Sequence, residues 1–233
     1  MWPLPSLNKQ FVAITMQPHY LTCSWIEQAQ KKAPLVLRAY KRFNLQNLAL
    51  EKLILFNPTY IKQCILLFLQ THQLKNAFIA FSLSGPTTIE QFVSLQTASP
   101  LPDQFSIQKI KNNLWGYEYI YPRDHQFVFY VYQIPHTTLL QFKLFSIAAH
   151  LNVIAIIPQR STLLLLYKFI YGNAFRRAQL AIDMIRYHNM IEYLFSPDLL
   201  ARIIDTSSCI QNIAIELPYL LPACGLFISE GMR

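Results

Sequence analysis

The sequence predicts a mixed domain of the α/β or α+β class, because strands and helices alternate along the chain. Of the 233 residues, 53% are apolar and only 14% are charged, which is enough apolar material for a large core. Period-two alternation of apolar residues indicates strands in several short segments, and helical spacing indicates helices between them. The same composition excludes disordered and fibrous proteins.

The first third of the chain predicts three strands followed by a helix. Residues 11–27 indicate a hairpin of two short strands, because apolar and polar residues alternate on both sides of a proline-containing turn. Residues 34–43 add a third alternating strand. Pro58 then stands at the first position of an amphipathic helix whose apolar residues repeat up to His72.

Two further strands follow this helix. Residues 77–83 are typical of a buried strand, the sequence Ser-Gly-Pro at 84–86 favours a turn, and residues 87–95 continue as another strand. A smaller α+β unit begins after two prolines. It is expected to contain a helix, two aromatic strands, a helix and a strand, over residues 105–114, 115–121, 126–132, 135–150 and 152–157.

The last third predicts a helix over residues 159–171, strands over 178–183 and 190–195, and an apolar segment from Pro218 onward. Taken together, the elements predict three parts. These are a first unit over residues 1–98, an inserted α+β subdomain over residues 99–157, and a return to the first unit over residues 158–233.

The glycines exclude the standard nucleotide-binding loops. The chain has five glycines, and no two are spaced as in GxGxxG or a Walker loop. These loops need glycine because backbone N–H groups must approach phosphate without a Cβ in the way. The net charge of +8 permits an acidic protein, a nucleic acid or an anionic membrane as partner. Because the basic residues are mostly scattered, nucleic-acid binding is a minor alternative.

The sequence offers no metal-binding or catalytic motif. The four cysteines are dispersed without CxxC, which favours reduced, mostly buried thiols in a cytosolic protein. No histidine pair forms HxxxH or HExxH, and no serine stands in GxSxG. We therefore expect neither a metal nor a catalytic residue. We also expect no secretory signal and no transmembrane span, since no apolar stretch reaches about 18 residues.

Four segments carry a resemblance to a known family. The first segment is residues 11–27, FVAITMQPHYLTCSWIE. It is similar to the family pattern VGIDIGxxxIKAVE, which forms a strand, a glycine-bearing turn and a return strand. Residues 56–95 are similar to a helix followed by ALxGxxVxxRxIxLP, residues 126–169 to VLLVAAxxxxVxxYxxxxxxAGLxPxxIDxExxALxR, and residues 220–231 to AxGLALR. In this order they resemble the PilM family and its short relatives called HofM. These are cytoplasmic actin-like proteins of type IV pilus, competence and related secretion assemblies.

The resemblance implies a reduced actin-like, ribonuclease H-like ATPase fold with a small inserted α+β subdomain. It implies a scaffold rather than an enzyme, on the cytoplasmic face of the inner membrane. The implied partner is a PilN-like bitopic membrane protein, whose short N-terminal tail is expected in a groove between the main domain and the insert. We expect this groove to be bordered by Ser84, Gly85, Pro86, Phe92 and Arg160.

Both phosphate-binding turns of actin-like ATPases are altered in this sequence. Thr15 stands in place of an acidic residue, and Gln17 begins a stretch that replaces glycine and small hydroxyl residues. The second turn keeps Asp183, but the bulky Met184 and Ile185 follow it. We therefore expect no bound nucleotide and no other cofactor. The alternative is an ATPase or switch of the same fold that binds ATP and Mg²⁺ weakly.

Overall fold

The computed structural model describes residues 10–17, 19–28, 34–45, 58–83, 88–100, 104–105, 113–123, 125–172, 201, 203–210 and 213–231. The elements are, in order, β1 (Phe11–Gln17), β2 (Tyr20–Glu27), β3 (Leu35–Asn44), α1 (Pro58–Thr71), β4 (Phe78–Leu83), β5 (Ile89–Leu95), β6 (Leu114–Arg123), β7 (Gln126–Ile134), α2 (His136–Ala148), β8 (Asn152–Pro158), α3 (Gln159–Tyr171), β9 (Ile204–Asp205) and α7 (Ile213–Gly231).

Six strands form the main sheet, in the order β8-β4-β1-β2-β3-β9. β1, β2 and β3 pair antiparallel, whereas β4 is parallel to β1, β8 is parallel to β4, and β9 is parallel to β3. The predicted hairpin, third strand and buried strand are confirmed as β1 to β4. The inner strands β1 and β4 are buried on both faces, as expected where helices cover each side of a sheet.

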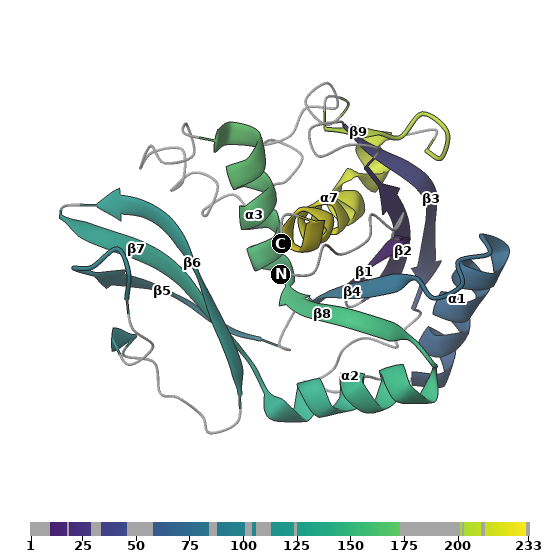
Figure 1. Ribbon diagram of the computed structural model, residues 1–233, viewed down its shortest axis with the longest axis horizontal. Coiled ribbons are helices and arrows are strands. Elements are labelled where there is room, and N and C mark those ends of the chain that lie inside the picture. The colour runs from purple at the N-terminus through teal and green to yellow at the C-terminus, as the bar shows by residue number, and fades with distance from the viewer. Residues whose placement is uncertain are drawn as a thin grey trace, which may run out of the picture.

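Helices pack on both faces of the main sheet (Figure 1). On one face, Ile61 and Phe68 of α1 and Phe142 of α2 join a cluster with the apolar side chains of β1 and β2. On the other face, α3 and α7 pack side by side through a second cluster that includes Leu164 and Leu221. The predicted helices over residues 58–72, 135–150 and 159–171 are confirmed as α1, α2 and α3.

A second, antiparallel sheet of three strands, β5-β7-β6, stands beside the main sheet (Figure 1). One face of this sheet packs on α3 through Tyr130 and Val128. The other face gathers aromatic side chains around Phe105, which packs on Phe129. The two aromatic strands predicted at residues 115–121 and 126–132 are confirmed as β6 and β7.

The two sheets do not follow the predicted subdomain boundaries at residues 98 and 157. β5 lies before the first boundary but pairs with β7 in the small sheet. β8 and α2 lie inside the predicted insert, yet β8 pairs with β4 and Phe142 packs on Phe81 of the main sheet. The physical reason is that strand pairing joins segments far apart in sequence, which local patterning does not report.

Other differences concern single segments. Leu114 begins β6, so the helix predicted to end there does not reach it, and residues 106–112 lie outside the described residues. The strands predicted at 178–183 and 190–195 also lie outside the described residues. The apolar segment from Pro218 is part of α7.

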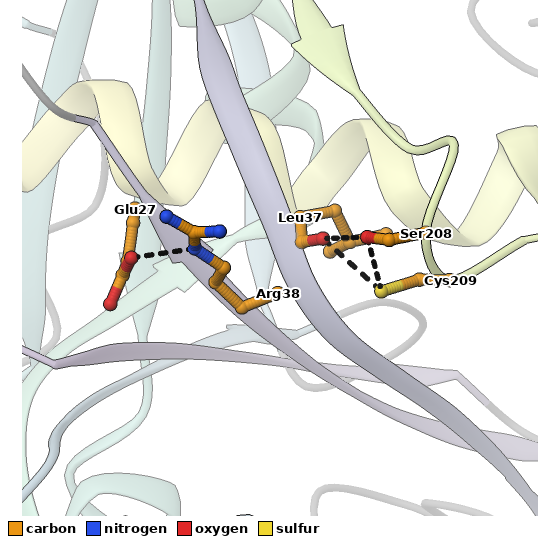
Figure 2. A network of polar contacts seen from close by, with 5 residues as sticks. All are labelled: Glu27, Leu37, Arg38, Ser208 and Cys209. Atoms are coloured by element: carbon orange, nitrogen blue, oxygen red, sulfur yellow. Dashed lines mark hydrogen bonds and ion pairs between the residues drawn. The ribbon is translucent and has the colours of Figure 1, made fainter.

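The chain returns to the main sheet through β9 and a polar network on β3 (Figure 2). Ser208 Oγ and Cys209 Sγ donate to the Leu37 carbonyl oxygen at 3.4 and 3.1 Å. The next residue of β3, Arg38, places its Nε 2.7 Å from Oε2 of Glu27 and so ties β3 to β2. The contacts of Ser208 and Cys209 with Leu37 fix the segment before α7 to β3.

Candidate functional site

The first candidate position is the turn between β1 and β2, where the resemblance places a phosphate-binding loop. Gln17 pairs with Tyr20, so positions 18 and 19 connect the two strands. Thr15 is 1% exposed and lies opposite Thr22 of β2 and Ser82 of β4. Its hydroxyl has no hydrogen-bond partner among the described residues. This position therefore supplies a neutral, buried hydroxyl and no carboxylate that could orient Mg²⁺ and water.

Side chains of α7 meet the sheet next to this turn. Tyr20 and Tyr219 pack with their ring centres 5.3 Å apart, and the Arg42 guanidinium carbon lies 5.3 and 4.8 Å from these two centres. Arg42 Nη2 lies 3.3 Å from Glu216 Oε1, and Tyr40 Oη donates to Glu216 Oε2 at 2.6 Å. Burial and the bond to Glu216 raise the pKa of Tyr40. Arg42 is thus paired within the chain, beside the turn where a phosphate is held in actin-like ATPases.

The second candidate position is the junction between the small sheet and α3. Arg160, in the first turn of α3, places Nη1 3.3 Å from Oε2 of Glu90 on β5. Its guanidinium carbon lies 6.0 Å from the centre of the Phe92 ring. The Phe92 ring packs in turn on Tyr130 of β7, with 5.6 Å between ring centres. Glu90, Phe92, Tyr130 and Arg160 together form the junction cluster.

The junction cluster is half-buried and electrically balanced. The side chains of Glu90 and Arg160 are 20% and 28% exposed, so their mutual attraction is only partly screened by water. Thr88 Oγ1 donates to the other carboxylate oxygen of Glu90 at 2.8 Å. Tyr130 is fully buried, and burial together with the neighbouring Glu90 charge raises the pKa of its hydroxyl. The cluster therefore holds β5 against α3 through one ion pair and through the contact of the Arg160 guanidinium with the Phe92 ring.

A second ion pair fixes the same helix to the far strand of the small sheet. Lys168 Nζ of α3 lies 3.1 Å from Glu118 Oε2 of β6. Arg160 and Lys168 are eight residues apart, which is about two helical turns, so both reach the small sheet from one side of α3. The small sheet is thus positioned on α3 at two points, while the opposite side of α3 packs in the core.

The outer edge of β5 is open among the described residues. β5 pairs with β7 along one edge, and no described strand pairs with the other. Phe92 is 38% exposed and Ile89 is 44% exposed on this strand. An unpaired edge offers main-chain donors and acceptors to an extended peptide, and an exposed aromatic ring beside it offers an apolar contact. Among the described residues, β5 therefore has both an unpaired edge and an exposed ring beside it.

The structure brings together two of the five residues predicted to border a groove. Phe92 and Arg160 are in contact at the junction. The predicted residues Ser84, Gly85 and Pro86 lie outside the described residues. Among the predicted phosphate-loop positions, Thr15 and Gln17 lie in β1 at the first turn, and Asp183 lies outside the described residues.

The sequence prediction missed Glu90 and Tyr130. Glu90 carries a signal in the sequence, because it is the only acidic residue between Glu51 and Asp103, and a lone carboxylate in an apolar region needs a partner. Tyr130 carries none, since it is one of many aromatic residues in an alternating strand.

Neither the turn between β1 and β2 nor the junction cluster contains a group of cysteines or other potential metal ligands among the described residues. All four cysteines are free, three of them buried and Cys209 half-buried, which confirms the expected mostly buried thiols. Within the described ranges, no group of three or more His, Cys, Asp or Glu side chains is placed to hold a metal ion. No helix in the same ranges is long and apolar enough to cross a membrane.

Comparison with known proteins bears on the fold. No protein-family model and no curated protein matches the sequence. Among solved structures, a chain of the PilM–PilN type IV pilus biogenesis complex matches with a TM-score of 0.53 and 11% identity, over 71% of this chain and 52% of that chain. The present chain thus spans about half the length of the PilM–PilN chain that it matches. The predicted actin-like fold and the resemblance in architecture to PilM are confirmed.

Two further structures match more distantly. One is the cytoplasmic domain of EpsL, an inner membrane component of the type II secretion system of Vibrio cholerae, with a TM-score of 0.39 and 7% identity over 66% of this chain and 57% of that chain. The other is a Bacteroides thetaiotaomicron protein with an actin-like ATPase fold and unknown function, with a TM-score of 0.39 and 11% identity over 73% of this chain and 59% of that chain.

Proposed function

We propose that this chain is a non-enzymatic scaffold of a type IV pilus, competence or related secretion assembly. Its partner is the N-terminal cytoplasmic tail of a PilN-like membrane protein with a single span. Through this partner the chain is held at the cytoplasmic face of the inner membrane. The proposal is supported by the fold shared with a chain of the PilM–PilN complex and by the outer edge of β5, with which no described strand pairs.

The observation that carries the proposal is the junction cluster at the unpaired edge of β5. A tail that adds to this edge would form main-chain hydrogen bonds along β5 and place an apolar side chain on the exposed ring of Phe92. The Arg160–Glu90 pair would keep β5 and α3 at a fixed separation, so the tail would meet a preformed surface. Apolar contacts would supply most of the affinity, and main-chain hydrogen bonds would set the register.

We further propose that binding does not depend on a nucleotide. Three observations support this: the missing glycine loops, the neutral and buried Thr15, and the pairing of Arg42 with Glu216 beside the first turn. A thermal-shift measurement with Mg-ATP tests it, because a ligand that binds the folded state raises the melting temperature. We expect no rise; a clear, saturable rise would support the weak ATP binder of the same fold.

The tail-binding proposal is tested with labelled peptides from the N-termini of membrane proteins encoded beside this chain, by fluorescence anisotropy. We expect Phe92→Ala to weaken binding about tenfold, as truncation of a central aromatic contact does. Tyr117→Ala is the matched control, because Tyr117 is 40% exposed on β6, at the opposite edge of the same small sheet. The control should bind as the unaltered protein does.

The main-chain part of the proposal has its own test. N-methylation of the peptide at alternate residues removes the N–H groups on one side of an extended strand only. One set of methylations should abolish binding and the other set should leave it nearly unchanged. Equal effects of both sets, or failure of every such tail to bind, would refute strand addition at β5.

A further inference from the structure

The outward-facing side of α2 carries apolar side chains although it is exposed to solvent. Leu140, Leu144 and Ile147 are 45%, 58% and 62% exposed. Their spacing of four and three residues places them on one side of the helix, facing away from the buried Phe142 and Phe145. In Figure 1, α2 runs along the lower edge of the molecule, and no labelled element lies beyond it. The three side chains form the α2 stripe.

Basic groups flank the α2 stripe, and carboxylates are absent from the neighbouring elements. His136 and Lys143 are exposed, and helical spacing places them beside the stripe. Residues 52–89 and 125–182 contain no aspartate or glutamate. The helices α1 and α2 and the edge strand β8 therefore contribute only neutral and basic side chains to this surface.

The surface continues from α2 to the end of α1. Lys62 Nζ of α1 donates to the carbonyl oxygen of Ala148, the last residue of α2, at 2.7 Å. A cavity of about 450 Å³ lies between the end of α1 and the loop after α2, and exposed Lys75 and His150 are among its lining residues. None of the residues that line this cavity is acidic. An anionic surface would therefore meet positive or neutral groups on α1, α2, β8 and the residues that line the cavity.

We propose that the α2 stripe docks on an anionic membrane surface. The three aliphatic side chains enter the boundary between headgroups and acyl chains, while Lys143 contacts lipid phosphates. The stripe exposes on the order of 300 Å², well below the roughly 800 Å² per partner that a stable protein interface buries. It also contains none of the Trp, Tyr and Arg side chains that dominate protein interfaces. This site is separate from the junction cluster and does not depend on tail binding.

The test is flotation of the purified protein with vesicles of three parts phosphatidylcholine to one part phosphatidylglycerol, and with pure phosphatidylcholine as comparison. We expect binding to the anionic vesicles alone, and weaker binding as salt is raised. The double substitution Leu144→Gln, Ile147→Gln should reduce the bound fraction at least tenfold, and Lys143→Glu should reduce it several-fold. Each altered side chain is exposed, so the melting temperature should stay unchanged.

The matched control is Ile215→Gln on α7, because Ile215 is 57% exposed and α7 covers the opposite face of the main sheet. This variant should float as the unaltered protein does. Absence of binding to anionic vesicles, or equal loss in the control, would overturn the proposal. So would sedimentation showing, without vesicles, a dimer that the double substitution dissociates, because the stripe would then be a contact between two copies.

Discussion

Gly225 of α7 lies directly against the backbone of Thr162 in α3, so that a Cβ on Gly225 would overlap the Thr162 carbonyl group. Thr162 is itself fixed, because its Oγ1 donates to the Gln159 carbonyl oxygen at 2.7 Å and lies 3.4 Å from Ser82 Oγ of β4. The close approach of α3 and α7 on the main sheet therefore depends on the missing side chain at this position.

Gly225→Ala should lower the free energy of unfolding by about 2 kcal/mol, because the added methyl group meets backbone that cannot move without separating the two helices. Gly116→Ala is the comparison. There the added methyl group meets the end of the Tyr132 side chain, which can rotate, so we expect a loss below about 1 kcal/mol. Urea denaturation followed by tryptophan fluorescence measures both. A larger loss at Gly116 than at Gly225 would contradict the packing described for α3 and α7.

The Arg160–Glu90 pair should show a measurable coupling in a double-mutant cycle of Arg160→Gln and Glu90→Gln. We expect about 0.5–1 kcal/mol at low salt, because both side chains are partly buried, and a smaller value at high salt. The pair Arg38–Glu27 serves as control. Arg38 is 52% exposed, so its coupling to Glu27 should be weaker despite the shorter distance of 2.7 Å. Equal coupling in the two cycles would show that burial does not decide their strength.

Alkaline pH should destabilise the fold through its buried tyrosines. Burial raises the pKa of Tyr40, Tyr130 and Tyr167 above the value of about 10 for free tyrosine. The folded chain keeps these protons where the unfolded chain loses them, so their contribution to stability is complete below about pH 10 and is lost as the pH rises further. Absorbance at 295 nm should show some of the 13 tyrosines ionising only on unfolding. Reversible ionisation of all of them near pH 10, with the fold intact, would contradict this prediction.

The four cysteines should differ in how fast their thiols react. Burial raises the pKa of Cys224 to about 12 and raises the pKa of Cys23 and Cys64, so these thiols stay protonated and shielded at pH 8. Cys209 is only half-buried and should react first with a chromogenic disulfide reagent. Cys209→Ser should remove the fast phase and leave the slow phase, which follows unfolding. A fast phase that persists in this variant would place another thiol at the surface.

Local sequence patterns predicted most helices and strands of the described residues, because each pattern reports on the side that its own segment buries. The helix over residues 159–171 was predicted with the bounds that the structure shows. Sheet membership was not predicted for β5 and β8. Each reads as an ordinary strand, and only pairing with β7 or β4 assigns it to a sheet. The boundary of the small sheet therefore depends on contacts between segments far apart in the sequence.

Two members of the junction cluster were named from the sequence as residues expected to border a groove, and that groove stays a prediction. The resemblance in architecture placed Phe92 and Arg160 at one groove, and the structure brings them into contact. The partner of Arg160 was missed, because Glu90 lies 70 positions earlier in the sequence and no local spacing links the two residues. The alternation of apolar and polar residues predicted the strand β7, but it did not show that the Tyr130 ring packs against the Phe92 ring.

The packing of α7 on the main sheet has a consequence for biosynthesis. β1 to β4 are complete by residue 83, whereas the two helices that pack on one face of these strands, α3 and α7, begin at residues 159 and 213. Until both helices have been translated, that face is only partly covered on a ribosome-bound nascent chain. Chaperones that hold apolar sheets during translation therefore have a defined target on this protein, and this face is fully covered only after α7 has left the exit tunnel.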